Sequence, residues 1–248
     1  MEDQIILIDK PAGISSFGVV AKVRSALKAK YGHKVKVGHT GTLDPFATGL
    51  LILLSGKMTK KSNDFLKKDK TYEATLKLGY TSTTGDPEGE ITEYKKLANF
   101  ANIEEHKGKT SDFATEGAKQ CDKITDLSRC GASEIGKICQ SFVGEIEQTP
   151  PAFSAIKING QRAYKLARKG EEVKIPARKV TIYSIEILSY KYPELKIRTH
   201  VSSGTYIRSL AEDIGKALGT GAYLTALRRT EIDKYKVEDA QTLADFTA

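Results

Sequence analysis

Five consecutive apolar residues, Leu50 to Leu54, restrict the possible folds of this chain more than any other feature. The run is far shorter than the ~20 residues that a membrane-spanning helix needs. A short apolar run that follows a glycine-bearing loop and ends at Gly56 is typical of a strand buried on both faces. The sequence therefore predicts a sheet in which this strand is covered on each side.

The spacing of apolar residues predicts further strands and helices around this strand. Apolar positions indicate strands over 5–8, 70–79, 180–188 and 195–202. Positions that repeat every three or four residues indicate helices that start at the Ser15-Ser16 pair, cover about 135–142, and run from Tyr206 to a stop at Gly219. The second helix is expected to lead into Thr149-Pro150-Pro151, where proline ends any helix. Strands separated by helices without a strict βαβ rhythm indicate an α+β fold with a mixed sheet.

The balance of charges limits the class of partner. The 248-residue chain has 39 Lys and Arg against 31 Asp and Glu, which gives a net charge of +8 and a pI near 9.2. This excess favours a polyanion. RNA, DNA and an anionic membrane all satisfy it, and so does a basic surface that only keeps the protein in solution, so charge alone does not identify the partner.

Acidic residues precede the first apolar run, which is the reverse of a signal peptide, so we expect a cytoplasmic protein. Cys121, Cys130 and Cys139 are too few and too widely spaced for a disulfide framework or a CxxC metal site. We therefore expect reduced thiols. Between 95 and 132 the composition shifts to Lys, Glu, Thr, Asp, Ala and Gly, which indicates an inserted or peripheral segment.

The densest chemical signal is the loop from Gly38 to Leu51, in which three glycines surround the carboxylate of Asp44. Glycine permits a positive φ and a close approach of the backbone to a ligand, so this loop has room for a bulky substrate beside Asp44. An aspartate before a proline is also a common turn former. The loop by itself therefore leaves both a reactive and a purely structural aspartate open.

Two glycine-containing sequences resemble nucleotide-binding motifs but fail their requirements. Gly56-Lys57 is followed by Met58 where a phosphate-binding P-loop needs Ser or Thr. After Gly219-Thr220-Gly221, position 224 is leucine where a dinucleotide fingerprint has glycine, so an αβ turn is the better interpretation. Neither sequence indicates a nucleotide cofactor.

The chain resembles a known family, the bacterial tRNA pseudouridine-55 synthases (TruB), in seven strings that follow the family's order over about residues 5–240. The related archaeal and eukaryotic box H/ACA synthases share the Asp44 loop, but the short N-terminus and the 150–170 segment look bacterial. The strings are Asp9-Lys10-Pro11-Ala12-Gly13, the loop 38–51, Lys70-Thr71-Tyr72-Glu73-Ala74, 150–155 with Lys157, 160–164 with Ala167, Arg168 and Gly170, Ser203-Gly204-Thr205-Tyr206-Ile207-Arg208, and Leu227-Arg228-Arg229-Thr230.

The resemblance implies the pseudouridine synthase catalytic fold, with a mixed, mostly antiparallel sheet, and the isomerisation of a tRNA uridine at position 55 of the T loop. It implies Asp44 as the nucleophile. Because desolvation beside an apolar strand disfavours an ionised carboxylate, an always-protonated cation is expected close to it, and the resemblance pairs Arg208 with it. Tyr72, which shares the apolar face of its strand, is expected to stack on the target base. Taken alone, Arg208 would be interpreted as a solvated helix residue and Tyr72 as core packing.

A uridine in a folded tRNA loop is stacked, so the enzyme must extrude it. By resemblance His39 braces the gap, and Tyr206 and Leu227 line the uridine pocket. A basic segment over 150–178 is expected to fold over the RNA loop like a thumb, through phosphate contacts and stacking. Its candidate RNA-binding residues are Lys157, Arg162 and Arg168, although a solvated basic helix face would have the same composition.

Two departures from the family pattern have consequences. Ser82-Thr83-Thr84-Gly85-Asp86 keeps only the second aspartate of the family's Thr-Asp-Thr-x-Asp pattern, which puts a secondary RNA or structural contact in doubt. The family also usually continues into a C-terminal RNA-binding domain of the PUA type or a shorter relative, whereas this chain ends at Ala248 and is expected to contain little or none of it. We therefore expect a catalytic domain over 1–240, a short tail over 241–248 and a weaker hold on the tRNA stem.

The resemblance implies tRNA as the partner through its T-arm loop, a monomer without an obligatory protein partner, and no cofactor, metal or membrane. Two alternatives remain. The scaffold would also suit a non-catalytic RNA-binding or tRNA-folding protein, or a guide-RNA-dependent relative. The presence of Asp44, Tyr72 and Arg208 together favours the enzyme, because a degenerate enzyme is expected to have lost at least one of them.

Overall fold

The computed structural model of the protein describes residues 2–94, 132–154, 156–158, 160–167, 169–170 and 175–247. The predicted insertion at 95–132 lies outside the described residues except for its last position. The chain divides into two compact units. Unit 1 comprises Met1–Ala74, Arg198–Gly204 and Ala226–Ala248, and unit 2 comprises Thr75–Ile197 and Thr205–Thr225.

Unit 1 is built on β3 (Thr48–Ser55), the strand predicted from the apolar run. β1 (Ile5–Lys10) and β2 (Val37–His39) pair with β3 in antiparallel fashion. β14 (Gln241–Thr242) lies parallel to β1, and the second half of β12 (Ala222–Ile232) lies parallel to β3. Alternate residues of β3 enter two separate apolar clusters, Leu51 and Leu53 in one and Leu50, Ile52 and Leu54 in the other. Both faces of β3 are therefore buried, as predicted.

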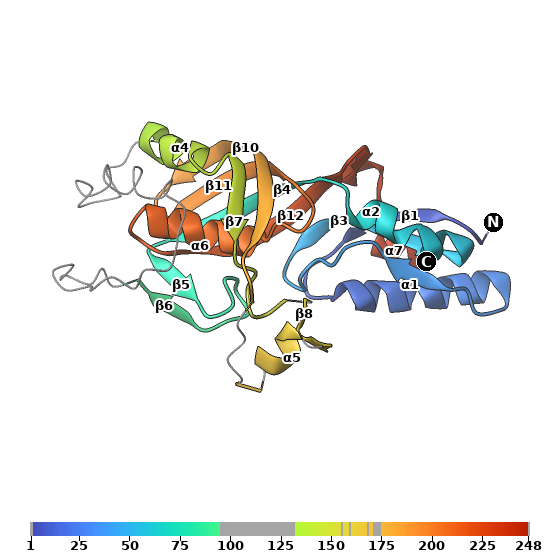
Figure 1. Ribbon diagram of the computed structural model, residues 1–248. Helices are drawn as coiled ribbons and strands as arrows, with labels where there is room; N and C mark the ends of the chain where they lie inside the picture. Colours follow the sequence, from blue (N-terminus) through green and yellow to red (C-terminus); the bar gives the residue numbers. More distant parts are fainter. Residues whose placement is uncertain are drawn as a thin grey trace. The chain divides into compact units, whose positions relative to one another are not determined.

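Helices cover both clusters of unit 1 (Figure 1). α1 (Ser16–Tyr31) starts at Ser15, whose side chain accepts a hydrogen bond from the Gly18 amide, and it ends at Gly32 with φ 77°. Its apolar residues Val19, Val20, Val23 and Leu27 are buried in the first cluster, and α7 (Leu243–Thr247) packs beside it. The second cluster contains Phe65 from α2 (Ser62–Leu66), which follows the 3-10 helix η1 (Gly56–Lys61), and Val237 from η3 (Val237–Asp239). The predicted first helix is confirmed.

The other strands of the sheet follow in the order β12, β4 (Lys70–Leu78), β11 (Glu194–Val201), β10 (Arg178–Lys191) and β7 (Gly144–Gln148). Unit 2 contains β10, β7 and the parts of β12, β4 and β11 that lie within Thr75–Ile197 and Thr205–Thr225, and the other parts of these three strands belong to unit 1. α4 (Ala132–Gln140) packs against β10 and against α6 (Ile207–Ala217). Three short elements complete it: the β5 (Tyr80–Ser82) and β6 (Ile91–Glu93) hairpin, the β8 (Lys157–Ile158) and β9 (Gln161–Arg162) hairpin, and α5 (Ala163–Ala167). β13 (Tyr235–Lys236) belongs to unit 1 and pairs with β12. Parallel and antiparallel pairs occur together, so the predicted α+β fold with a mixed sheet is confirmed.

One prediction about the path of the chain is wrong, and one long strand was not predicted. The helix that carries Ile135 and Cys139 ends at Gln140, and the stretch before Thr149 forms β7 instead of leading a helix into Pro150. Glycine at 144, with φ 124°, and the alternation that follows it fit a strand paired with β10. The 11-residue strand β12 was not predicted either, although the αβ turn before it is confirmed, since α6 ends at Ala217 and β12 starts at Ala222. Within the described ranges, no helix has both the length and the apolar character to cross a membrane.

Candidate active site

Asp44 lies in the connection from β2 to β3 of unit 1, and main-chain contacts fix this loop on both sides. The amide and the hydroxyl of Thr40 both donate to the carbonyl of Ile52, at 3.0 and 3.2 Å. On the other side the amide of Ala47 donates to the carbonyl of Asp44 at 3.2 Å. The loop is therefore a fixed turn on the end of a buried strand, with Asp44 within it.

The first turn of α1 fixes the residue before Asp44. Ser16, only 2% exposed, donates through its hydroxyl to the carbonyl of Leu43 at 3.0 Å and accepts from the amide of Leu43 at 2.8 Å. Both polar groups of the Leu43 main chain are thus bound by one side chain. The two serines therefore have different roles: Ser15 caps the helix, and Ser16 binds the loop.

A buried ammonium fixes the residue after Asp44. Lys10 is fully buried, and its Nζ donates to the carbonyls of Pro11, Ile14 and Pro45 at 2.9, 2.7 and 3.1 Å. Three acceptors match the three donors of an ammonium group, which makes its burial tolerable. Lys10 thereby joins the turn after β1 to the peptide that directly follows Asp44.

A buried guanidinium holds the remaining side of the loop. Arg229 on β12 is 1% exposed, and it donates from Nε to the carbonyl of Leu50 at 2.8 Å and from Nη2 to that of Gly41 at 3.2 Å. In the sheet register Gly49 pairs with Lys10 on one side and with Arg229 on the other. Gly49 has φ 102°, and a Cβ there would lie 2.3 Å from the carbonyl oxygen of Arg229. Only glycine fits between the two strands at this point.

Sequence reasoning missed Lys10, Ser16 and Arg229 as supports of the loop. Apolar spacing assigns charged side chains to the surface, and nothing local indicates that these two cations are among the largest fully buried side chains. The available signal was their place in the strings that resemble the family. Side chains that are matched but carry no assigned chemistry are candidates for this supporting role.

The first residues of β4 bring another buried cation to the same unit. Lys70, Tyr72 and Ala74 point to the buried face, with 7%, 7% and 1% exposure, and Leu227 on β12 is 7% exposed. The ammonium of Lys70 donates to the carbonyls of Leu66, at 3.1 Å, and Lys68. Burial, with a smaller contribution from the nearby Arg229 cation, lowers the pKa of Lys70 to about 8.

The depressed pKa of Lys70 predicts a pH dependence of stability. Between about pH 8 and the ordinary lysine value of 10.5 the unfolded chain binds a proton that the folded chain has released, so the free energy of unfolding rises with pH. A Lys70→Met variant lacks this gain. We expect the wild-type protein to become more stable relative to the variant as the pH goes from 7.5 to 9.5, measured by urea unfolding. A constant difference between the two proteins would contradict the prediction.

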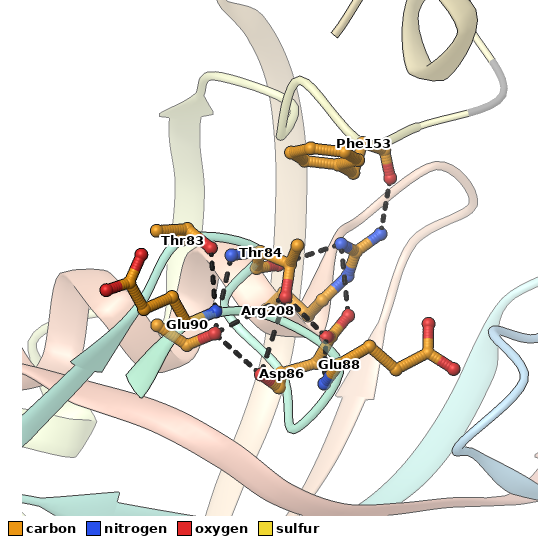
Figure 2. A network of polar contacts seen from close by, with 8 residues as sticks. Thr83, Thr84, Asp86, Glu88, Glu90, Phe153 and Arg208 are labelled. Carbon is orange, nitrogen blue, oxygen red and sulfur yellow. Dashed lines mark hydrogen bonds and ion pairs between the residues drawn. The ribbon is translucent and has the colours of Figure 1, made fainter. Parts of the chain in front are cut away.

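Arg208 of unit 2 is the centre of a buried polar network (Figure 2). It is 3% exposed, and its Nη1 lies 3.3 Å from Oδ2 of Asp86 and donates to the carbonyl of Thr84 at 2.9 Å. Its Nη2 donates to the carbonyl of Phe153 at 2.8 Å. Arg208 is therefore not the solvated helix arginine that its sequence position alone would suggest.

The loop between β5 and β6 presents Asp86 to Arg208. Oδ1 of Asp86 accepts from the hydroxyl of Thr84 at 2.6 Å and from the amide of Glu88 at 3.0 Å, which leaves Oδ2 for the arginine. Gly85 has φ 72°, and a Cβ there would lie 2.5 Å from Oε1 of Glu212 on α6. The single aspartate kept from the family pattern is therefore the carboxylate that binds Arg208, a role that the sequence did not assign to it.

Tyr206 precedes α6 and is held by a neighbouring strand. Its amide donates to Oε1 of Gln148 at 2.7 Å, and its carbonyl accepts from Nε2 of the same side chain at 3.0 Å. The guanidinium of Arg178 lies over the Tyr206 ring at 5.0 Å from the centroid. Sequence reasoning named Tyr206 but neither Gln148 nor Arg178.

The remaining predicted residues have the following positions. His39 ends β2 in unit 1, and its Nδ1 accepts from the Gly41 amide at 3.4 Å. Arg162 is exposed on β9 of unit 2, where it pairs in register with Lys157 of β8. Arg168 lies outside the described residues. Unit 1 thus carries His39, Asp44, Tyr72 and Leu227, and unit 2 carries Lys157, Arg162, Tyr206 and Arg208, whose assigned roles stay predictions.

The described residues contain no group of three or more His, Cys, Asp and Glu side chains that would suit a metal ion. Cys139 of α4 is a buried thiol, and burial raises its pKa to about 11. It is therefore protonated and poorly nucleophilic at neutral pH. Cys121 and Cys130 lie outside the described residues.

Known proteins are similar to this chain in sequence and fold over nearly its whole length. The family profile "TruB family pseudouridylate synthase (N terminal domain)" matches residues 24–114 and 105–207, and "tRNA pseudouridylate synthase B C-terminal domain" matches residues 208–248. A protein named tRNA pseudouridine synthase B from Aquifex aeolicus is 44% identical, with 98% of this chain and 73% of that protein covered. One of the same name from Phocaeicola vulgatus is 42% identical, with 99% and 92% covered.

A solved structure extends the likeness to the fold. The crystal structure of a Cbf5-Nop10-Gar1 complex contains a chain with a TM-score of 0.64 and 28% identity, and the match covers 98% of this chain but only 53% of that one. This chain therefore spans about half the length of that structural relative. Together the sequence and fold matches confirm the predicted pseudouridine synthase fold, and the chain belongs to the TruB family of pseudouridylate synthases.

Proposed function

We propose that the protein is a tRNA pseudouridine synthase that converts a uridine of the T loop, at position 55, to pseudouridine. The observation that carries this proposal is the 44% identity to a protein named tRNA pseudouridine synthase B over 98% of this chain. The supported loop around Asp44 agrees with it, because side chains from α1, β1 and β12 hold a single carboxylate in one turn. Such rigidity is what a reactive group needs.

The reaction requires little more than one carboxylate. The glycosidic bond between C1' and N1 breaks, the uracil turns, C5 joins C1', and the proton of C5 is lost while N1 gains one, so there is no net oxidation or hydrolysis. We propose that ionised Asp44 attacks the substrate or stabilises positive charge on the sugar, and then removes the proton from C5. The chemistry needs no redox cofactor.

Arg208 and Tyr72 are proposed as the partners of Asp44 in this chemistry. A guanidinium stays protonated at any working pH, so Arg208 is suited to keep a carboxylate ionised. Its two terminal nitrogens already have fixed acceptors in Thr84, Phe153 and Asp86, which orients it before substrate binds. Tyr72 is proposed to stack on the uracil, and its hydroxyl to assist the proton transfers.

The remaining residues are proposed to extrude and hold the uridine. His39, in the same loop as Asp44, is assigned to the gap left by the base, and Tyr206 and Leu227 to the pocket that receives it. Lys157, Arg162 and Arg168 are assigned to the RNA loop. We further propose that the enzyme works in the cytoplasm as a monomer without an obligatory protein partner.

The test uses the purified full chain and an unmodified tRNA transcript with tritium at C5 of uridine. Turnover releases this tritium to water, because C5 loses its proton when it joins C1'. The transcript with uridine 55 replaced by cytidine is the matched control and is expected to release none. Since only protein and bare tRNA are present, a guide-RNA-dependent enzyme would give no release, and a non-catalytic RNA-binding protein would bind the transcript without releasing tritium.

Substitution of Arg162 is expected to change the salt dependence of tRNA binding. It is exposed on β9, and an arginine that contacts a phosphate releases a counterion on binding. We expect Arg162→Gln to lower the slope of log Kd against log salt by about one, measured by filter binding between 50 and 200 mM salt. Lys179→Gln, which removes an exposed cation paired with Glu145, is the control. Equal slopes for Arg162→Gln and the wild-type protein would remove Arg162 from the RNA interface.

A further inference from the structure

The side chain of Gln148 makes two hydrogen bonds to the main chain of Tyr206, as a paired strand would. The Tyr206 main chain is extended, with φ −98° and ψ 113°, and it lies just before α6, where no preceding helical turn supplies an acceptor for its amide. The carboxamide of Gln148 supplies both an acceptor at 2.7 Å and a donor at 3.0 Å, the two contacts that a neighbouring strand would make. Gln148 is 1% exposed, so water does not compete for either contact.

Arg178 acts on the ring of the same tyrosine. Its guanidinium carbon lies 5.0 Å from the centre of the Tyr206 ring, which is within the range of a cation–π contact. Arg178 and Gln148 are direct partners in the antiparallel pairing of β10 with β7. One cross-strand pair therefore holds both the backbone and the side chain of Tyr206.

This pair stands at the base of the predicted RNA-binding segment. The chain leaves β7 after Gln148, runs through 150–178, and returns to β10 at Arg178. Two further contacts tie the outgoing end of the segment to α6. The hydroxyl of Ser209 donates to the carbonyl of Thr149 at 3.0 Å, and Arg208 donates to that of Phe153 at 2.8 Å.

We propose that Gln148 and Arg178 are positioning residues for the isomerisation, which hold Tyr206 in the orientation that the uridine pocket needs and join it to the base of the 150–178 segment. The proposal rests on the proposed function. On this proposal neither residue acts directly on the reacting atoms. Both act through Tyr206, and a small displacement of a pocket residue is enough to slow a reaction that depends on the alignment of the base.

Arg178 offers the sharper experiment, because it acts on the tyrosine ring. We expect Arg178→Met to lower kcat on tRNA about tenfold while KM changes by no more than about twofold. The reason is that the substitution disturbs the orientation of the bound uridine and not the binding of RNA. Arg178→Lys keeps a cation over the ring but loses the planar group, and is expected to restore part of the rate. Lys179→Met, the neighbouring residue, is the matched control and is expected to retain the wild-type rate.

A double-mutant cycle separates positioning from general stability. If Arg178 acts through the ring, Arg178→Met has no further effect on kcat in a Tyr206→Ala background. A similar fall in kcat in both backgrounds overturns the proposal. So does an unchanged kcat accompanied only by a lower midpoint of thermal unfolding.

Gln148 supplies a second, independent measurement. Gln148→Met removes the acceptor of the Tyr206 amide and one of the two donors to its carbonyl, which keeps the Leu210 amide at 3.1 Å, whereas Gln148→Glu keeps the acceptor and loses the donor. Both are expected to lower kcat, Met more than Glu. Gln140→Met, which removes a glutamine bond to the carbonyl of Ile185 elsewhere in unit 2, is expected to leave kcat unchanged. Wild-type rates for both Gln148 variants overturn the role of Gln148, and an inactive wild-type protein instead overturns the proposed function itself.

Discussion

Asp44→Asn is expected to abolish turnover while the fold and the affinity for tRNA stay unchanged. Asparagine has the same shape, and the contacts that Lys10, Ser16 and the Ala47 amide make with the loop go to main-chain groups of Leu43, Asp44 and Pro45, which the substitution keeps. An amide is neither a nucleophile nor a base at neutral pH. The loss in kcat should be on the order of 10⁴-fold or more, as when other enzymes lose their nucleophile.

The measurement is single-turnover release of tritium from C5 of uridine, together with filter binding of the same tRNA. Asp233→Asn is a suitable control, because Asp233 is a carboxylate of the same unit that pairs with Lys68 and has φ 52°, a conformation that asparagine tolerates. We expect the control to turn over at the wild-type rate. If Asp44→Asn kept a rate within about tenfold of the wild-type value, Asp44 would not be the nucleophile.

Among the substitutions proposed here, Asp86→Ala is expected to lower the free energy of unfolding the most. Asp86 and Arg208 are each 4% exposed at the side chain and lie 3.3 Å apart. Removing one member of a buried pair leaves the other charge without its counterion, which typically costs about 3–5 kcal/mol. The Thr84 hydroxyl and the Glu88 amide also lose an acceptor. The free energy of unfolding in urea measures the loss.

Two further variants distinguish the charge from the shape of Asp86. Asp86→Asn keeps acceptor oxygen and volume, so it should destabilise less than alanine. Glu145→Ala breaks an exposed ion pair with Lys179 and should change stability little. Equal stability of Asp86→Ala and Glu145→Ala would show that the buried pair contributes nothing. In the folded fraction, Asp86→Ala should also lower kcat, because Arg208 loses the carboxylate that orients it.

Local spacing determined much of the fold. β3 follows from an unbroken apolar run, β4 from apolar residues at a period of two, and α1 and α6 from apolar residues every three or four positions. Each of these patterns is a property of consecutive residues. The prediction of the helix that contains Ile135 was correct for the middle of the helix but wrong for its end, because Pro150 was taken as the residue that stops it. The strand β7 intervenes, and its pairing with β10 depends on residues thirty or more positions later in the chain.

The sequence by itself determined the kind of fold, the family and the carboxylate on which the proposed chemistry depends. The reason is that each of the strings around Asp44, Tyr72 and Arg208 is a short run of neighbouring residues, which can be recognised without the folded structure. The tertiary structure alone decided which polar side chains are buried. Arg229 binds the carbonyl of Leu50 across 179 positions, and Arg208 binds that of Thr84 across 124. A charged residue enters a protein interior only where distant segments supply acceptors for it. No local pattern contains that information, so the supports of the candidate site became visible only in the folded chain.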